Sequence, residues 1–270
     1  MKDIKKIALN VIQKAWSKAS HPYVLCSFGK DSILLLCLLQ EADLLEEVPI
    51  LYIDSGFEFP ELYKHRDKVL EYFKIPDYNY VCVRNESVKP DAYETTPIFE
   101  LSQQLKTIPL NKAIKDREID FLITGIRRDE EGSRSKERYF SYRDENGFYN
   151  PSDNKPEYYP FVGTNISSPE KGHYRANPLL DWTELDVWLY FQKRRYDEIP
   201  MCPLYFSKDG KRYRSLGDAP VTTPIESEAK TYSDITAELL NTTIPERISR
   251  QKQDESAPFC MENLRRNGFC

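Results

Sequence analysis

Apolar residues recur along the first half of the chain in two alternating patterns, one helical and one typical of buried strands. Residues 4–18 place apolar side chains at every third or fourth position, which predicts an amphipathic helix. Short β-prone runs follow at residues 23–26, 50–53, 80–83 and 121–124, and helix-favouring segments separate them. Such an alternation is typical of a parallel sheet covered on both faces. The pattern predicts an α/β domain with a mostly parallel sheet of about five strands and helices on both faces.

The second half of the chain is less regular. Residues 146–174 are rich in Asn, Pro, Tyr, Gly and Ser, which predicts a long surface excursion. Thr183, with Asp186 three residues later, is a capping signature that predicts the start of a helix. Beyond residue 200 the periodicity weakens, so we expect an extended C-terminal tail with one helix. The sequence thus predicts one α/β domain over residues 1–200, with residues 201–270 packed on or beside it.

Composition excludes several classes of protein. Hydrophobic residues make up 40% of the 270 residues and charged residues 30%, as in globular domains that bury a sizeable core. No apolar run approaches the roughly 20 residues of a membrane span, and the charged N-terminus lacks the apolar core of a secretion signal. The six cysteines form no CxxC pair, so neither a zinc site nor a disulfide framework is expected. We expect a cytoplasmic protein that contacts no membrane and supplies no metal-ligand cluster.

The polar segment Ser27–Ser32, between a predicted strand and a predicted helix, is the strongest candidate for chemistry. Gly29 permits a turn that a Cβ would hinder. The free N–H groups at the start of the following helix, with the helix dipole, form a site for anionic oxygen. Lys30 adds a positive charge, and the two serine hydroxyls add donors. The GxxxxGK[ST] pattern of the Walker A loop is absent. The segment predicts a phosphate-binding loop; the alternative is a polar turn without a ligand.

A second candidate is the mixed-charge segment that follows the fourth predicted strand. Its basic residues are Arg127, Arg128, Arg134, Lys136, Arg138 and Arg143. Two adjacent arginines at the carboxyl end of a strand can hold a tetrahedral anion through charge-assisted hydrogen bonds. The acidic residues of the segment could bind Mg²⁺ or orient the arginines. The alternative is a solvated mixed-charge helix.

Several segments carry a family resemblance. Ser27–Ser32 resembles the pyrophosphate loop of the adenine nucleotide alpha-hydrolase superfamily, whose members hold the β- and γ-phosphates of ATP and cleave at the α-phosphate. Residues 125–138, 177–188 and 242–247 resemble signatures of the small, catalytic subunit of bacterial sulfate adenylyltransferase. This branch is related to the phosphoadenylylsulfate reductases, and the resemblance covers nearly the whole chain.

The resemblance implies ATP and Mg²⁺ as cofactors and assigns roles to individual residues. The residues that would hold the departing pyrophosphate are Ser27, Gly29, Lys30, Asp31 and Ser32. Lys30 would neutralise the charge that develops on this leaving group. Arg127 and Arg128 would position the attacking anion, which makes these three cations the predicted catalytic residues.

The resemblance also points to Asp54, Ser55 and Gly56 at the end of the second predicted strand, where members of the superfamily contact the nucleoside. Gly56 would let the backbone approach the base or the ribose closely. Gly125, at the end of the fourth predicted strand, completes the expected nucleotide-binding set. The alternative is that Asp54 only caps the following helix.

Two specific functions remain open, and both use ATP and an anionic acceptor. The first is adenylyl transfer to sulfate with a GTPase subunit as partner, which the full-length resemblance favours. The second is ATP pyrophosphatase activity in DNA phosphorothioation, alongside a cysteine desulfurase. Asp218 and Ala219, where the family usually has cysteine and an aromatic residue, and the terminal Cys270 favour this second function. A non-catalytic nucleotide-binding regulator is a third alternative.

The remaining histidines, cysteines and tryptophans give weaker signals. His65 and His173 show no partner pattern and are predicted at the surface. The residues predicted in the core or at interfaces are Cys26, Cys37, Trp16, Trp182 and Trp188. Cys260 and Cys270 lie in a polar tail, and the sequence leaves open whether their thiols react. Net charge is −5, so any DNA contact would depend on local basic clusters. These clusters are Lys193–Arg195, Lys211–Arg214 and Arg265–Arg266.

Overall fold

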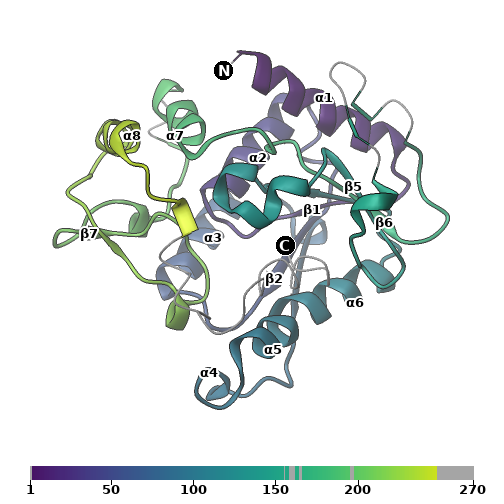
Figure 1. Cartoon of the computed structure of the whole chain (residues 1–270), viewed down its shortest axis with the longest axis horizontal. Helices are drawn as coiled ribbons and strands as arrows, with labels where there is room; N and C mark the ends of the chain where they lie inside the picture. The colour runs from purple at the N-terminus through teal and green to yellow at the C-terminus, as the bar shows by residue number, and fades with distance from the viewer. Residues whose placement is uncertain (1, 155, 158–161, 164–165, 195–197, 248–270) are drawn as a thin grey trace.

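A six-stranded sheet runs through the centre of the molecule in the order β3-β2-β1-β4-β6-β5 (Figure 1). The computed structural model describes residues 2–247, with gaps at 155, 158–161, 164–165 and 195–197. The strands are β1 (Pro22–Leu25), β2 (Ile50–Asp54), β3 (Tyr80–Arg84), β4 (Phe121–Thr124), β5 (Phe140–Arg143) and β6 (His173–Ala176). All neighbouring pairs are parallel except β5 and β6, which are antiparallel. The predicted α/β class with a mostly parallel sheet is confirmed.

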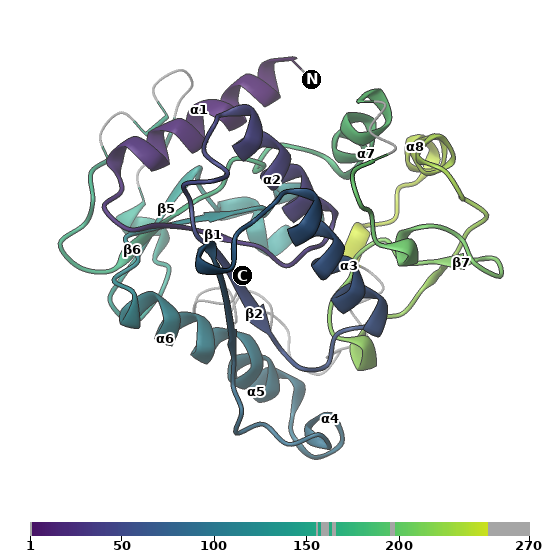
Figure 2. The same cartoon turned by 180° about the vertical axis from the view of Figure 1, so that it is seen from behind.

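Helices cover both faces of this sheet, as expected. The helices of the described chain are α1 (Lys2–Lys18), α2 (Lys30–Glu41), α3 (Pro60–Tyr72), α4 (Ala92–Thr95), α5 (Ile98–Ser102), α6 (Ile108–Asp116), α7 (Glu184–Lys193) and α8 (Tyr232–Asn241). The first three pack on one face and α6 on the other, as Figures 1 and 2 show for α1, α2 and α6. A π-helical turn at Gln103–Thr107 separates α5 from α6.

The central strands are apolar along their whole length because they feed cores on both faces. In β4, Phe121 and Ile123 join the core beneath α1 and α2, and Leu122 joins the core beneath α6. All three side chains are fully buried. This double burial explains the continuous apolar runs from which the strands were predicted.

Two strands lie where the sequence did not indicate them. β5 falls inside the mixed-charge segment, and β6 begins at the end of the predicted surface excursion. Each buries an arginine, Arg143 or Arg175, in place of an apolar side chain. Arg143 pairs with buried Glu137 at 2.7 Å. Buried ion pairs do not produce a periodic apolar pattern, so the sequence did not predict these two strands. The sheet therefore has six strands instead of the expected five or so. The excursion is also not wholly at the surface, since Tyr149 and Val162 are buried.

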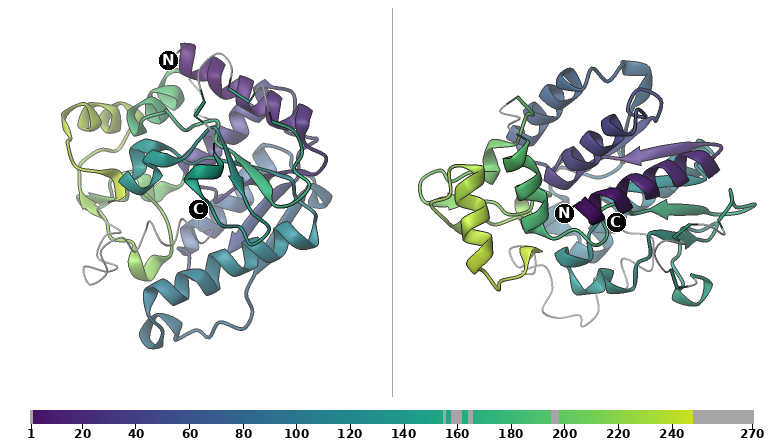
Figure 3. Two further views of the ribbon diagram at one scale, coloured as in Figure 1. Left: turned by 45° about the vertical axis from the view of Figure 1, so that its right-hand side comes forward. Right: turned by 90° about the horizontal axis from the view of Figure 1, so that it is seen from above.

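Residues 201–247 extend along one side of the domain, beside α7 (Figure 3). They contain the short strands β7 (Lys211–Arg212) and β8 (Ile225–Glu226) and the predicted helix, α8. The Trp188 ring of α7 lies 5.5 Å from the Tyr205 ring and 5.9 Å from the Tyr232 ring. These aromatic contacts join the segment to the main core, and the boundary at residue 200 stays a prediction. Within the described part of the chain, no helix has both the length and the apolar character to cross a membrane.

The two histidines predicted at the surface are buried instead, and that prediction is wrong. His65 is 3% exposed and His173 2% exposed. Burial lowers the pKa of His65 to about 4 and lowers the pKa of His173 as well, so both side chains are neutral at pH 7. The buried positions predicted for four other residues are confirmed: Cys26, Cys37, Trp182 and Trp188. Trp16 is partly buried against the core. Cys260 and Cys270 lie outside the described residues.

Candidate functional site

The loop between β1 and α2 lies where the order of the sheet reverses. β1 pairs with β2 on one side and with β4 on the other, so the chain extends the sheet first to one side of β1 and, after β3, to the other side. The crevice outside the carboxyl ends of such strands is where open α/β sheets bind ligands. α2 begins at Lys30, directly after Gly29. The predicted phosphate loop therefore occupies the position in the fold that favours a ligand.

The start of α2 offers donors to an anion. Gly29 caps the helix without a side-chain hydrogen bond, and the first turn of a helix leaves N–H groups without an intrahelical partner. The Ser27 N–H donates to the Ser32 hydroxyl at 3.0 Å, and the two serine hydroxyls lie 3.1 Å apart. This contact holds both hydroxyls beside the helix N-terminus.

The left-handed turn of the loop falls at Phe28, not at Gly29. Phe28 has a φ of 57°, whereas Gly29 has an extended backbone with a φ of −75°. Gly29 is needed for space, because a Cβ there would lie 3.1 Å from the Tyr205 hydroxyl. That hydroxyl accepts a hydrogen bond from the Lys30 N–H at 3.0 Å. The prediction that Gly29 serves the turn is thus corrected: its small size lets Tyr205 reach the loop.

The loop forms one wall of a cavity. Ser27, Gly29, Lys30, Asp31 and Ser32 line it, together with Gly125 after β4. The cationic side chains along its walls are Lys30, Lys106, Arg134 and Arg247. The acidic ones are Asp31, Glu58 and Glu130. Cationic side chains and a helix N-terminus on the same cavity favour a ligand with several negative charges.

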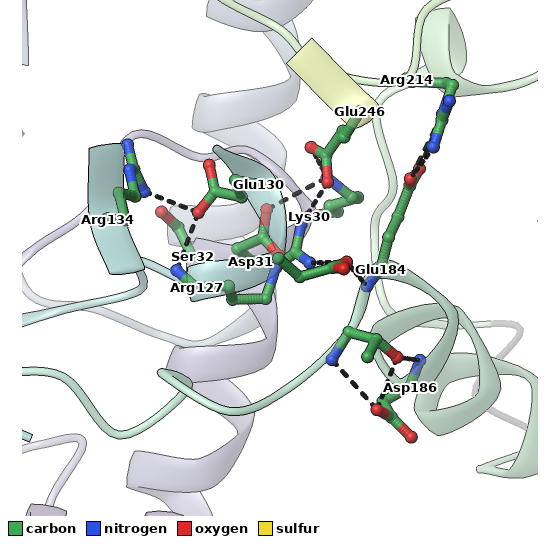
Figure 4. A network of polar contacts seen from close by, with 12 residues as sticks. Lys30, Asp31, Ser32, Arg127, Glu130, Arg134, Glu184, Asp186, Arg214 and Glu246 are labelled. Carbon is green, nitrogen blue, oxygen red and sulfur yellow. Dashed lines mark hydrogen bonds and ion pairs between the residues drawn. The ribbon is translucent and has the colours of Figure 1, made fainter. Parts of the chain in front are cut away.

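Lys30 and Arg127 share a buried carboxylate (Figure 4). The Lys30 ammonium lies 2.5 Å from Glu246 and 3.1 Å from Asp31. Arg127 donates through Nε to Asp31 at 2.7 Å and through a terminal nitrogen to Glu246. Burial by itself would raise the pKa of Glu246, but the Lys30 and Arg127 charges outweigh it and hold the pKa at about 2. Glu246 is therefore ionised, and it fixes both cations beside the loop.

Glu130 forms a second centre of charge on the cavity wall. It accepts hydrogen bonds from the Arg127 N–H at 2.9 Å and from Arg134 at 2.7 Å, and Arg247 lies 3.0 Å from its other oxygen. Burial opposes ionisation, but the charges of Arg134 and Arg247 outweigh it and keep the pKa well below its usual value. Both arginines are thereby held at the cavity.

Arg128 points away from Arg127. Its guanidinium contacts Asp181 and donates to the Glu137 carbonyl at 2.9 Å. The backbone at Arg127 is extended, and successive side chains of an extended segment point in opposite directions. The structure does not bring these two predicted catalytic residues to one point, and neither lines the cavity in the described part of the chain.

Asp54, Ser55 and Gly56 lie beside the cavity rather than on its wall. Asp54 accepts hydrogen bonds from the Gly56 N–H and the Tyr63 hydroxyl, each at 2.8 Å. The helix α3 is capped at Phe59, so Asp54 does not cap it. Gly56 has a φ of 80°, and a Cβ there would lie 1.8 Å from an Arg84 nitrogen. These residues shape the turn after β2, and their contact with a nucleoside stays a prediction.

A buried polar cluster lies at the same end of β2. Glu58 accepts a hydrogen bond from the Tyr52 hydroxyl, and Asp218 accepts from Ser55 at 2.6 Å and lies 3.1 Å from the Lys106 ammonium. Burial raises the pKa of Glu58 to about 7 against the opposing effects of Lys106 and Tyr52. A carboxyl with this pKa in a cavity can take up or release a proton near neutral pH.

Several residues of the cavity wall carry no strong signal in the sequence. Arg134 was one of six basic residues in a segment, and Glu246 and Arg247 carried only a family resemblance. Lys106 gave no signal, because a lysine in a helix-favouring segment reads as a solvated side chain. It reaches the cavity from the π-helical turn, a feature frequent at functional sites.

This fold and loop define the class of protein: a nucleotide-binding α/β protein with a pyrophosphate loop at the switch point of its sheet. Residues 21–224 match the model of the phosphoadenosine phosphosulfate reductase domain. The chain belongs to this family of enzymes.

Two relatives with an assigned name match this chain over its whole length. Sulfate adenylyltransferase subunit 2 of Rhizobium meliloti (strain 1021) is 31% identical, over 100% of this chain and 92% of the relative. The protein of the same name from Akkermansia muciniphila is also 31% identical, over 100% of this chain and 97% of the relative. The chain therefore resembles these relatives over its entire length.

Solved structures share the fold at low identity. A phosphoadenylyl-sulfate reductase from Candida auris, in complex with phosphate, has a TM-score of 0.53 and 16% identity, covering 80% of this chain and 90% of that one. Candida glabrata FMN adenylyltransferase with FAD and inorganic pyrophosphate also has a TM-score of 0.53 and 16% identity, covering 98% and 77%. Both comparisons place the chain in one fold with these proteins.

Proposed function

We propose that the protein transfers the adenylyl group of ATP to sulfate and releases pyrophosphate. The observation that carries this proposal is the 31% identity to sulfate adenylyltransferase subunit 2, which spans the whole chain. The cavity supports it, because a helix N-terminus, Lys30 and two arginines border a space next to the switch point of the sheet.

The reaction is a displacement at phosphorus. A sulfate oxygen attacks the α-phosphorus of ATP. The bond from that phosphorus to the oxygen that bridges the α- and β-phosphates breaks, and pyrophosphate departs with the electron pair. Ser27, Gly29, Asp31 and Ser32 form the loop that holds the departing pyrophosphate. Lys30 neutralises the charge that grows on it. Catalysis then depends on positioning and electrostatics, without a covalent enzyme intermediate.

In this proposal, Mg²⁺ would bind to the protein together with ATP. The described residues hold no group of three or more histidine, cysteine or carboxylate side chains that could bind a metal ion together. Both Asp31 oxygens already contact cations, one Lys30 and the other Arg127. Mg²⁺ commonly keeps several waters and binds through substrate phosphates with one or two carboxylates, and Asp31 on the cavity wall could take that role only in place of one of these contacts. Bound there, the ion would offset phosphate charge.

The partners follow from the same proposal. As a small subunit, the chain would act in the cytoplasm with a second, GTP-hydrolysing subunit. A DNA substrate has less support, because Arg212 and Arg214 of one predicted basic cluster are buried. They pair with Glu238 and Glu184, each at 2.5 Å. The clusters Lys193–Arg195 and Arg265–Arg266 include residues outside the described part of the chain.

One observation favours a second candidate, ATP pyrophosphatase activity in DNA phosphorothioation. Glu58 on the cavity wall has a pKa near 7 and could accept a proton from a protic acceptor, which sulfate does not require. The nucleotide product separates the two functions, since sulfate gives adenylyl sulfate and water gives AMP.

The decisive test compares wild type with Lys30→Met. We expect wild type to release pyrophosphate from MgATP in a sulfate-dependent manner, with adenylyl sulfate as the product. Removing the Lys30 charge should lower kcat by at least about a hundredfold, because one charge-stabilising contact is worth roughly that much. Pyrophosphate release and the nucleotide product are measured by coupled assay and chromatography. AMP formation without sulfate dependence would establish the second candidate, and an unimpaired Lys30→Met enzyme would remove the loop from the mechanism.

A further inference from the structure

The cations that line the cavity differ from those predicted to position the acceptor. Arg134 and Arg247 lie on its wall with Lys30, whereas Arg127 and Arg128 do not. A small anion that reacts inside the cavity would therefore meet Arg134 and Arg247 first.

Arg127 has little capacity left for a further anion. Its Nε contacts Asp31 at 2.7 Å, one terminal nitrogen lies 3.1 Å from Asp129, and the other donates to Glu246. The side chain is completely buried. Arg127 holds Lys30 and the loop carboxylate in place and so acts as a positioning residue.

Glu130 instead holds two guanidiniums at one place. Arg134 lies 2.7 Å from one oxygen of Glu130, and Arg247 lies 3.0 Å from the other. A second carboxylate, Glu131, lies 3.2 Å from Arg247. Glu130 is itself anchored by the Arg127 N–H, directly after β4. The two arginines thus come from distant parts of the sequence and are fixed on the same wall.

Arg247 keeps an unused donor. Its Nε is buried and has no hydrogen-bond partner in the part of the chain that the structure describes. A buried donor without a partner is costly, so a ligand that accepts a hydrogen bond there would be favoured. A guanidinium also matches the oxygens of a tetrahedral oxyanion through two parallel hydrogen bonds.

We propose that Arg134 and Arg247 together bind the tetrahedral oxyanion that attacks the α-phosphate, with Glu130 as the residue that positions them. The inference rests on the proposed function and names the acceptor site within it. Lys30 and the loop then serve the leaving pyrophosphate, and the two arginines serve the incoming sulfate. The sequence-based assignment to Arg127 and Arg128 is replaced on this account.

The test is steady-state kinetics of pyrophosphate release with sulfate and MgATP varied separately. We expect Arg134→Gln and Arg247→Gln each to raise the KM for sulfate about ten- to hundredfold, the effect of losing one charge-assisted hydrogen bond. The KM for ATP should change less than threefold. Arg247→Lys should recover part of the loss, because it restores the charge without the paired geometry.

Arg66→Gln is the control for removing an arginine elsewhere, since Arg66 pairs with Asp67 on α3 and does not line the cavity. Circular dichroism and thermal unfolding check that each variant folds. If one of the glutamine variants does not fold, its kinetic measurement is replaced by a binding measurement on Arg247→Lys. Sulfate binding to that variant is then measured in the presence of a non-hydrolysable ATP analogue.

The outcomes separate the inference from the proposed function. If wild type shows no sulfate-dependent release, the proposed function fails and the inference fails with it. If wild type is active but the sulfate KM of both variants stays within twofold, only the inference is overturned. A rise in sulfate KM for Arg128→Gln alone would restore the sequence-based assignment. Equal rises in both KM values would indicate a structural role for the arginines.

Discussion

At the residue scale, Glu58 shows how a carboxyl in this fold departs from its ordinary chemistry. It is 9% exposed, accepts a hydrogen bond from Tyr52, and lies near the negative charges of Asp54 and Asp218. Burial contributes most to its raised pKa, which is about 7. Near neutral pH the folded protein therefore holds Glu58 partly protonated, whereas an unfolded glutamate is ionised above about pH 4.3.

This pKa predicts a pH-dependent stability. Because the pKa is higher in the folded state, wild type should lose stability as the pH rises from about 4 to about 7 and lose no more above that. Glu58→Gln cannot ionise and keeps an acceptor for Tyr52. The variant should match wild type near pH 4 and exceed it by about 3 kcal/mol above pH 7. Urea unfolding at pH 5, 6, 7 and 8 measures the difference. A constant difference across this range would contradict the raised pKa.

The phosphate loop shows what residue-level reasoning could and could not predict. The position of Ser27–Ser32 at a strand-to-helix turn was read correctly from the sequence, although α2 already begins at Lys30. Which residue takes the left-handed conformation was not, because the fully buried Phe28 ring packs 5.3 Å from Tyr52 and so favours a backbone that isolated residues avoid. That contact depends on a strand more than twenty residues away.

At the element scale, local signals predicted helix starts well. The capping box at Thr183 is present: the Asp186 N–H donates to the Thr183 hydroxyl at 3.1 Å, and Asp186 accepts from the Thr183 N–H at 3.0 Å. Pro60 stands at the first position of α3, where the fixed φ of proline suits a helix start. These contacts lie within one helical turn, so the sequence contains all of their partners.

We predict that Thr183→Ala lowers the free energy of unfolding by about 1 kcal/mol, because the Asp186 N–H in the first turn of α7 loses the Thr183 hydroxyl as its acceptor. Thr183→Ser keeps the hydroxyl and serves as the matched control, with a change of less than about 0.5 kcal/mol. Urea unfolding monitored by circular dichroism measures both. Equal losses for alanine and serine would assign the effect to the methyl group instead of the cap.

At the scale of the whole molecule, the end of the described chain reaches the phosphate loop. Glu246 lies 216 positions after Lys30, and its carboxylate contacts both Lys30 and Arg127. The side chain of Glu246 is 1% exposed. A carboxylate at this point offsets the charges that would otherwise attract pyrophosphate.

Glu246→Gln should have two opposite effects. Removing one partner of a buried ion pair should lower the free energy of unfolding by about 3 kcal/mol or more. At the same time, Lys30 and Arg127 lose a competing anion, so pyrophosphate should bind more tightly. Thermal unfolding with and without the same excess of pyrophosphate measures both, since a ligand that binds only the folded state raises Tm by an amount that grows with the logarithm of its affinity. A smaller pyrophosphate-induced Tm shift in the variant than in wild type would contradict the competition.

The sequence by itself determined the α/β class, the strands β1 to β4, the position of the predicted phosphate loop and the family, because each depends on periodicity or on neighbouring residues. It did not determine β5 and β6, in which buried Arg143, paired with Glu137, and buried Arg175 interrupt the apolar pattern. Nor did it determine which cations face the cavity. Arg127 and Arg128 are adjacent in sequence but point apart, and Arg134 and Arg247 are far apart but meet at Glu130. Only tertiary packing brings such charges together. A buried charge without a partner is too costly, and in the folded protein its partner can come from any part of the chain.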